Sequence, residues 1–130
     1  MKEITIIARN DVGALAIVAE ALGSVGVNIE AISAYGSDST AVFRVLTNDV
    51  ATATKALGKF PQFKLSEAET VVYRMINRPG ELGKITRKLS NRGINLESMY
   101  IVSKQSEYTE VAICPSTKDV DKVKEILGIK

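Results

Sequence analysis

The sequence predicts an α+β protein built from two copies of one βαββα(β) unit. Two observations lead to this prediction. The chain aligns with itself when it is shifted by 67 residues, which places Asn10 on Asn77. Each half also alternates short β-rich runs with apolar residues at helical spacing. The composition agrees with a globular fold, since 45% of the 130 residues are hydrophobic and 25% are charged.

The internal repeat predicts two domains, residues 1–69 and 70–130. The offset stays at 67 through the first part of each copy and later grows to 70. The second copy has therefore gained three residues around its hairpin and the approach to its second helix. The identical pairs at the offset of 67 include Asn10/Asn77, Gly13/Gly80, Leu15/Leu82, Leu22/Leu89, Gly26/Gly93, Asn28/Asn95 and Glu30/Glu97.

The first copy is expected to have the order βαββαβ. The apolar series Leu15, Val18 and Leu22 predicts its first helix, and Gly26 is expected to end that helix in a left-handed conformation. A second helix is expected after the hairpin, in residues 49–59. The predicted strands cover residues 4–9, 28–35, 41–47 and 63–66.

The second copy repeats this order and leaves no room for a fourth strand. Strands are predicted at residues 71–76, 95–103 and 109–114, and helices at 80–91 and 118–127. The order βαββαβ followed by βαββα is the ferredoxin-like split-βαβ arrangement, with the last strand of the second repeat missing. It predicts two antiparallel sheets, each with its helices on one face.

The first helices of the two copies differ in polarity. The first carries several alanines and Ile17 around its apolar series, whereas the second carries Glu81, Lys84, Arg87 and Lys88. A helix that is apolar nearly all round is buried on more than one side. We therefore expect the first helix to lie in an interface and the second to face water.

Several classes of function are excluded by what the sequence lacks. The net charge of +2 is too small and dispersed for a nucleic-acid surface. Without histidine, and with Cys114 as the one cysteine, no metal site, cofactor or nucleophile–base pair is expected. No apolar run has the length of a membrane helix, and no signal peptide precedes the first strand. We expect a cytoplasmic protein without catalytic activity.

The turn after the first strand carries the most specific motif of each copy. Residues 77–82 read Asn-Arg-Pro-Gly-Glu-Leu, and Gly-Ile-Asn-Leu-Glu-Ser follows at 93–98. Residues 10–15 and 26–30 repeat the pattern without the proline. This pattern resembles the ACT domain, a regulatory module of many amino-acid-controlled enzymes. Over its whole length the chain is similar to a stand-alone tandem ACT protein with no enzyme fused to it.

The resemblance implies an amino-acid site. In serine-regulated ACT domains, the turn asparagine and the asparagine that opens the second strand hold a free amino acid between adjacent domains. A carboxamide has donors and an acceptor for both ends of a zwitterion, and backbone N–H groups at a helix start favour a carboxylate. The matching candidate ligand-binding residues are Asn10, Asp11, Gly13, Asn28, Asn77, Gly80 and Asn95.

One departure from the serine-binding pattern bears on the ligand. Serine-binding members carry a histidine two residues before the turn asparagine, where this chain has Ala8 and Met75. Both side chains are apolar. The departure favours a more hydrophobic ligand, or loss of binding in one or both copies.

A purely structural role explains the same residues. Asn10 and Asn77 would then cap helices, each contributing about 1 kcal/mol. Asn28 and Asn95 would be ordinary turn residues. The glycines are what a tight strand-to-helix turn requires.

The expected function is regulatory. The chain would bind a free amino acid at the interface between ACT repeats and signal to a partner enzyme, and it would form a homodimer. The alternative is a ligand-free protein-interaction module, or a regulatory subunit of an amino-acid biosynthetic enzyme. Neither interpretation involves nucleic acid or a membrane.

Overall fold

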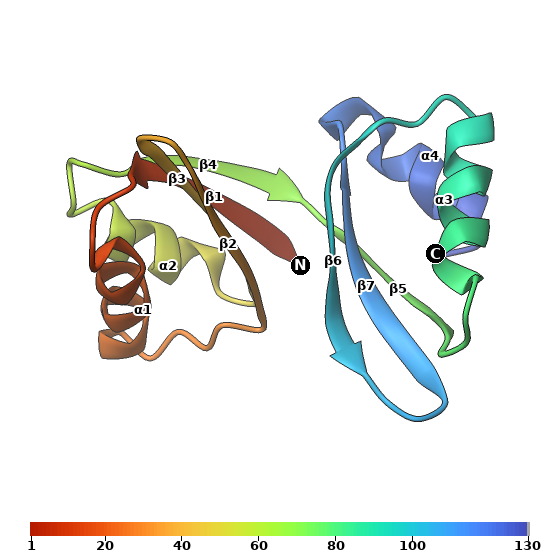
Figure 1. Cartoon of the computed structure of the whole chain (residues 1–130), viewed down its shortest axis with the longest axis horizontal. Coiled ribbons are helices and arrows are strands. Elements are labelled where there is room, and N and C mark those ends of the chain that lie inside the picture. The colour runs from red at the N-terminus through yellow and green to blue at the C-terminus, as the bar shows by residue number, and fades with distance from the viewer. Residues whose placement is uncertain (130) are drawn as a thin grey trace. The chain divides into compact units, whose positions relative to one another are not determined.

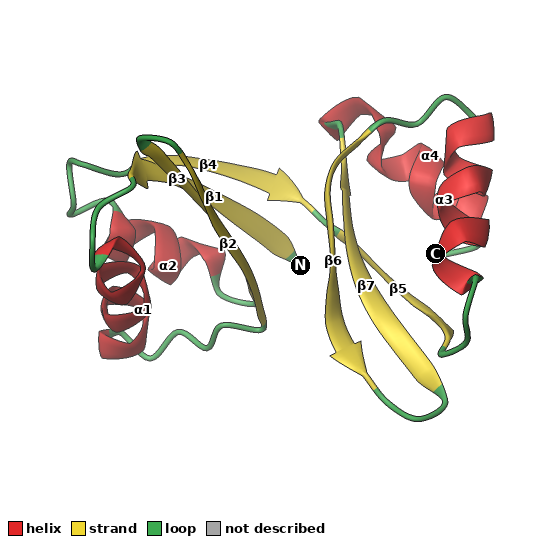
Figure 2. Cartoon of the chain, in the orientation of Figure 1, coloured by secondary structure: helices red, strands yellow, loops and turns green. Residues whose placement is uncertain are grey.

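The computed structural model describes residues 1–129, which form two compact units (Figure 1). Unit 1 spans Met1–Ala68 and unit 2 begins at Glu69. Within each unit, two α-helices cover one face of a β-sheet (Figure 2). None of the helices in this part of the chain has both the length and the apolar character that a membrane span requires.

Unit 1 has the element order βαββαβ. Its strands lie in the order β2-β3-β1-β4, so β1 and β3 are the central strands. They run antiparallel, with Ile6 opposite Phe43. The elements are β1 (Lys2–Arg9), α1 (Ala14–Ser24), β2 (Ala31–Ser37), β3 (Thr40–Thr47), α2 (Val50–Leu57) and β4 (Lys64–Glu69).

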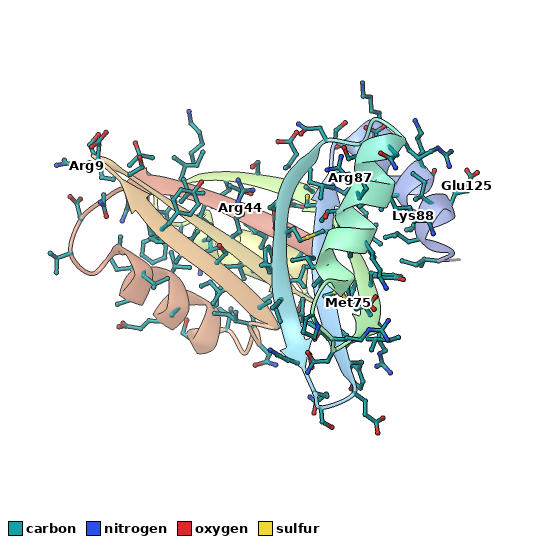
Figure 3. All side chains as sticks on the ribbon, turned by 45° about the vertical axis from the view of Figure 1, so that its right-hand side comes forward. Arg9, Arg44, Met75, Arg87, Lys88 and Glu125 are labelled. Carbon is teal, nitrogen blue, oxygen red and sulfur yellow. The ribbon has the colours of Figure 1, made fainter. Side chains whose placement is uncertain are left out.

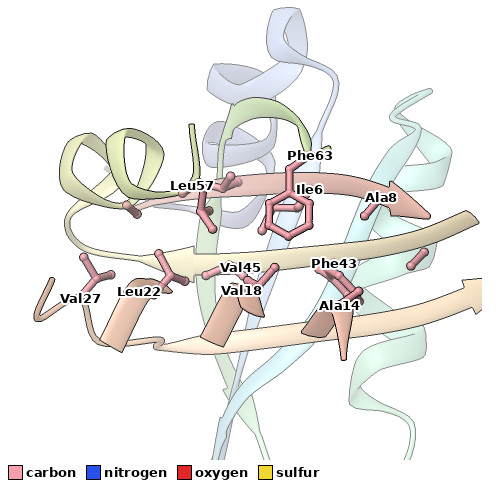
Figure 4. Close-up of a cluster of buried hydrophobic side chains, with 13 residues drawn as sticks. Ile6, Ala8, Ala14, Val18, Leu22, Val27, Phe43, Val45, Leu57 and Phe63 are labelled. Atoms are coloured by element: carbon pink, nitrogen blue, oxygen red, sulfur yellow. The ribbon is translucent and has the colours of Figure 1, made fainter. Parts of the chain in front are cut away.

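The core of unit 1 lies between the sheet and its two helices. Ile4, Ile6 and Ala8 alternate along β1 and are buried, because successive strand residues point to opposite faces of a sheet. Val18 and Leu22 of α1 pack against them (Figure 4). Side chains spaced by four residues lie on one face of a helix, and α1 buries Ala14, Val18 and Leu22.

Glycines in the left-handed conformation lie at both ends of α1. Gly13 is the N-cap residue with φ 87°, and Gly26 has φ 74° just beyond the helix. After Gly26, the N–H of Val27 donates to the carbonyl oxygen of Leu22 at 3.0 Å, a bond that closes the last helical turn. A residue with a Cβ would lose about 1–2 kcal/mol in this conformation, which explains the glycine at both positions.

Unit 2 repeats the order βαββα, with a short 3₁₀ turn before its last helix. Its sheet has three strands in the order β5-β7-β6 within the described residues. β6 shifts register against β7 at two places, between Leu96 and Ser98 and between Ile101 and Ser103. The elements are β5 (Val71–Ile76), α3 (Glu81–Asn91), β6 (Leu96–Lys104), β7 (Tyr108–Pro115), η1 (Thr117–Asp119) and α4 (Val120–Leu127).

The core of unit 2 is separate from that of unit 1. Val71 of β5 and Val111 of β7 are buried against Ile85 and Leu89 of α3. The remaining sides of α3 carry charged residues, in agreement with its sequence pattern. Each unit therefore has a hydrophobic core of its own.

The predicted fold class is confirmed, and two strand boundaries differ from the prediction by three residues. β2 begins at Ala31 rather than at residue 28, because Val27 completes the cap of α1 and is buried in the core. β4 extends to Glu69, beyond the predicted end at residue 66, because it continues beside β1. The sheet of unit 2 has the three strands expected of βαββα.

Candidate functional site

The strand-to-helix turns of the two units have the same backbone geometry. Gly13 has φ 87° and ψ −1°, and Gly80 has φ 88° and ψ −11°. A Cβ atom at either position would meet no heavy atom within 4 Å. The requirement for glycine is therefore conformational, and space beside these residues is open.

The turn asparagines tie each turn to the tip of the neighbouring hairpin. The Asn10 Nδ2 donates to the carbonyl oxygen of Asp38 at 3.1 Å. The Asn77 Nδ2 donates to the carbonyl oxygen of Gln105 at 2.7 Å. The backbone N–H groups of both asparagines also donate to hairpin carbonyl oxygens, at 2.9 and 3.0 Å. Each carboxamide thus closes a loop of the same length.

The helix-capping interpretation of these asparagines is wrong. The N-cap residues are Gly13 and Gly80, and neither helix has a side-chain cap. Asn10 and Asn77 lie three residues earlier, where their side chains reach the hairpin rather than the helix. Their role in the fold is to hold the turn and the hairpin tip together.

Gly36 allows the Asn10 carboxamide to lie flat on the hairpin. A Cβ at Gly36 would lie 2.6 Å from Asn10 Nδ2 and 2.9 Å from both Cγ and Oδ1. Gly36 is not among the residues that the sequence predicts for the site. The signal that would have found its contact is the pairing of the hairpin, which brings residue 36 beside the turn.

The second pair of asparagines lies at the other end of the helices. Asn28 and Asn95 are exposed and follow α1 and α3, whereas Asn10 and Asn77 precede them. A helix of 11 residues is about 16 Å long. The Asn28 Nδ2 donates to Glu30 Oε1 at 3.3 Å. Within one unit, the two predicted carboxamides are therefore not brought together.

A cavity of about 190 Å³ opens beside the turn of unit 1. The end of β1, the turn, the start of α1 and the segment before β4 form its walls, and Ala8, Ala14 and Phe63 lie around the same end of the core (Figure 4). The cavity has room for several water molecules and hence for a small organic group. Its apolar lining residues are Ala8, Val12, Ala14, Ile17 and Phe63, and its polar ones are Arg9, Asp11 and Gln62.

Two opposite charges lie at the rim of this cavity. The Arg9 Nε is 3.7 Å from Asp11 Oδ2, and the two side chains are 86% and 60% exposed. The Arg9 side chain points outward from the end of β1 (Figure 3). An ion pair so exposed contributes at most about 1 kcal/mol. Both groups are therefore available to a ligand with the opposite charges.

The turn of unit 2 holds a cluster of paired charges instead. The Arg78 Nε donates to Glu81 Oε1 at 2.8 Å, and the Lys84 Nζ donates to the same oxygen at 3.3 Å. Glu81 is buried although its two partners are largely exposed. The hydrogen bond from Arg78 lowers the pKa of the Glu81 carboxyl, with Lys84 acting in the same direction against the effect of burial.

The predicted residues thus have different surroundings. Asp11 lines the cavity of unit 1, and Gly13 shapes the turn beside it. Gln62 and Phe63 also line the cavity. They could not be predicted as site residues because they are far from the turn along the chain. Within residues 1–129, no three His, Cys, Asp or Glu side chains gather as a metal site would require.

Comparisons with known proteins agree with this description. The sequence model of the ACT domain matches residues 70–128. No curated protein sequence matches the chain. Among solved structures, the fold is similar to that of protein BT0572 from Bacteroides thetaiotaomicron, with a TM-score of 0.84 and 29% identity. That match covers 98% of this chain and 85% of the other.

Two further structural matches are regulatory subunits of aspartate kinase. The ligand-free subunit from Thermus thermophilus has a TM-score of 0.73 and 14% identity, covering 98% of this chain and 90% of that one. The subunit from Thermus flavus has a TM-score of 0.68 and 15% identity, with the same coverage of both chains. At these identities the likeness shows the fold. Both units of the chain therefore have a ferredoxin-like fold, and residues 70–128 match the ACT domain.

Proposed function

We propose that the chain is a non-catalytic regulatory protein of two ACT repeats that binds a free amino acid beside its strand-to-helix turns and signals to a partner enzyme. The observation that carries the proposal is the cavity beside the turn of unit 1. It combines apolar lining residues with the guanidinium group of Arg9 and the carboxylate of Asp11 at its rim. Small-molecule sites in proteins share this construction.

The second asparagine of each copy belongs to the proposed site only if a neighbouring ACT unit supplies it. Asn10 and Asn28 lie at opposite ends of α1, so one small ligand cannot touch both within one unit. A ligand held between two ACT units, from this chain or from a second copy in a homodimer, would meet both. Such a ligand would favour one mutual arrangement of the units, which is how binding would be passed on.

The signal would reach a partner enzyme, because the chain itself offers no catalytic pair among its described residues. Regulatory subunits of aspartate kinase have the same fold. The partner that we propose for this chain is an enzyme of amino-acid metabolism in the cytoplasm.

A thermal-shift screen of the pure protein against the twenty amino acids tests the proposal. At a hundred times its Kd, a ligand stabilises the folded state by about 2.7 kcal/mol, which raises the melting temperature of a domain of this size by several degrees. A shift confined to one amino acid or a few related ones supports the proposal. A folded protein that responds to none contradicts it and favours the ligand-free interaction module.

A further inference from the structure

The two units differ in the side chains that surround the equivalent turns. The offset of 67 residues places Asp11, Ala14 and Ile17 of unit 1 on Arg78, Glu81 and Lys84 of unit 2. In unit 1 all three residues line the cavity. In unit 2 all three carry charge and join one ion-paired cluster. The two turns therefore differ where a ligand would lie.

The cluster of unit 2 is self-contained. Glu81 is 9% exposed, and its Oε1 accepts hydrogen bonds from both Arg78 and Lys84. A ligand entering there would have to separate a buried carboxylate from its partners. A ligand would thus have to compete with Arg78 and Lys84 for this carboxylate, so the cluster opposes entry of a ligand at this turn.

The cavity of unit 1 has the opposite character. Ala14, Ile17, Ala8 and Phe63 line it with apolar side chains, and Gln62 is its uncharged polar lining residue. Charge is confined to Arg9 and Asp11 at the rim. A guanidinium binds a carboxylate with well-defined geometry, and a carboxylate accepts hydrogen bonds from an ammonium group.

We infer that each chain binds one amino acid with an aliphatic side chain, in unit 1, and that the Arg78–Glu81–Lys84 cluster closes the equivalent place in unit 2. The side chain enters the cavity, the carboxylate pairs with Arg9 and the ammonium group with Asp11. This inference rests on the proposed function and narrows it to one unit and one class of amino acid.

The apolar interior sets the order of affinities. Each methylene group that moves from water into the cavity strengthens binding about fourfold. Valine, leucine and isoleucine therefore bind more tightly than alanine. Serine binds weakly because it brings little apolar surface into the cavity. Lysine binds weakly because its ammonium group would lose water among mostly apolar side chains.

Isothermal titration of the full chain with L-leucine, L-valine, L-serine and L-lysine tests the inference. The expected result is one aliphatic amino acid bound per chain. Two chemical controls examine the rim. 4-Methylpentanoate lacks the ammonium group of leucine and 3-methylbutylamine lacks its carboxylate, and each is expected to bind roughly tenfold to a hundredfold more weakly.

Exchange of residues between the units supplies a matched pair of variants. Ala14→Glu with Ile17→Lys places the unit 2 residues in unit 1 and is expected to abolish binding. Glu81→Ala with Lys84→Ile makes the reverse exchange in unit 2 and is expected to leave the affinity of the unit 1 site unchanged. Arg9→Gln, at an exposed position that does not threaten folding, is expected to weaken binding roughly tenfold or more.

The outcomes separate this inference from the proposed function. Two amino acids per chain, loss of binding in the unit 2 variant, or full affinity in Arg9→Gln would overturn the inference and leave the proposed function standing. Preference for serine or lysine would do the same. Absence of binding to every amino acid by the wild-type chain would overturn the proposed function, and the inference with it.

Discussion

The Nδ2 atom of Asn77 donates a hydrogen bond across 2.7 Å to the carbonyl oxygen of Gln105, which lies 28 residues further along the chain. Asn10 and Asp38 are joined in the same way, also across 28 residues. The bond ties the end of the first strand to the tip of a hairpin in each unit. It gives the repeated asparagine a role in the fold besides any role in binding.

Replacing Asn77 with aspartate tests this tie. The substitution keeps the shape of the side chain but exchanges the donor for a second oxygen that faces the carbonyl group of Gln105. Loss of one hydrogen bond destabilises a protein by about 1 kcal/mol. Urea unfolding should show a loss of this size, and hydrogen exchange should accelerate at the hairpin tip. Asn10→Asp is the matched variant, and unchanged exchange in both would show that the bond does not hold the hairpin.

The contact between Gly36 and Asn10 predicts a coupled effect. An alanine at position 36 would place its Cβ 2.6 Å from Asn10 Nδ2, so the exposed carboxamide must move and its bond to Asp38 is lost. We expect Gly36→Ala to cost about 1 kcal/mol of stability. In an Asn10→Ala background the same substitution should cost much less, as a double-mutant cycle would measure. Additive effects would contradict the contact.

Alanine substitutions of two neighbouring glycines should have opposite signs. Gly80 has φ 88°, so Gly80→Ala should destabilise unit 2 by about 1–2 kcal/mol through the backbone alone. Gly83 lies within α3, where an added Cβ meets no atom within 4 Å. Gly83→Ala should therefore stabilise the helix by roughly 0.5–1 kcal/mol. Thermal unfolding of both variants measures the difference, and a stabilising Gly80→Ala would refute the conformational argument.

The Glu81 cluster predicts a dependence of stability on acid. Arg78 lowers the pKa of the Glu81 carboxyl below its ordinary value of 4.5, so folding favours the ionised form. The resulting stability is present above the ordinary pKa and is lost as the pH falls through the lowered value. The wild type should therefore be more stable than Glu81→Gln above the ordinary pKa of the carboxyl. This difference in the free energy of unfolding, measured with urea, should disappear as the pH falls through the lowered pKa.

The control for this titration is Glu97→Gln, which removes an exposed glutamate of β6. It changes the net charge by the same amount without touching the cluster. If both variants differed from the wild type equally at every pH, the ion pairs of Glu81 would not stabilise unit 2.

The repeat and its periodicities were sufficient to predict the fold. The burial of Leu15 and Leu82 was not predicted correctly by the sequence pattern. Both belong to the predicted apolar series, yet they are 41% and 43% exposed, whereas Ala14 and Glu81 next to them are buried. The buried face of each helix follows a spacing of four residues, from Ala14 to Leu22 and from Glu81 to Leu89, rather than starting at the predicted leucine.

The site could be predicted only in part. Asp11 and Gly13 stand out because they lie within the repeated turn. The cavity depends on Gln62 and Phe63, which contact the turn only after α2 has crossed the sheet. The polarity difference between the two first helices was visible in the sequence, and it was interpreted as a difference in burial of α1. The expectation that α1 lies in an interface stays a prediction.

The equal spans closed by the two asparagine ties also record how the copies diverged. From Asn10 to Asp38 and from Asn77 to Gln105 the chain has kept one length. The three residues gained by the second copy all come later, at its hairpin tip and in the stretch that contains η1. A bond that closes a loop tolerates substitutions inside the loop more readily than insertions. The hydrogen bond thus explains why the enclosed segment has the same length in both copies, whereas the insertions lie outside it.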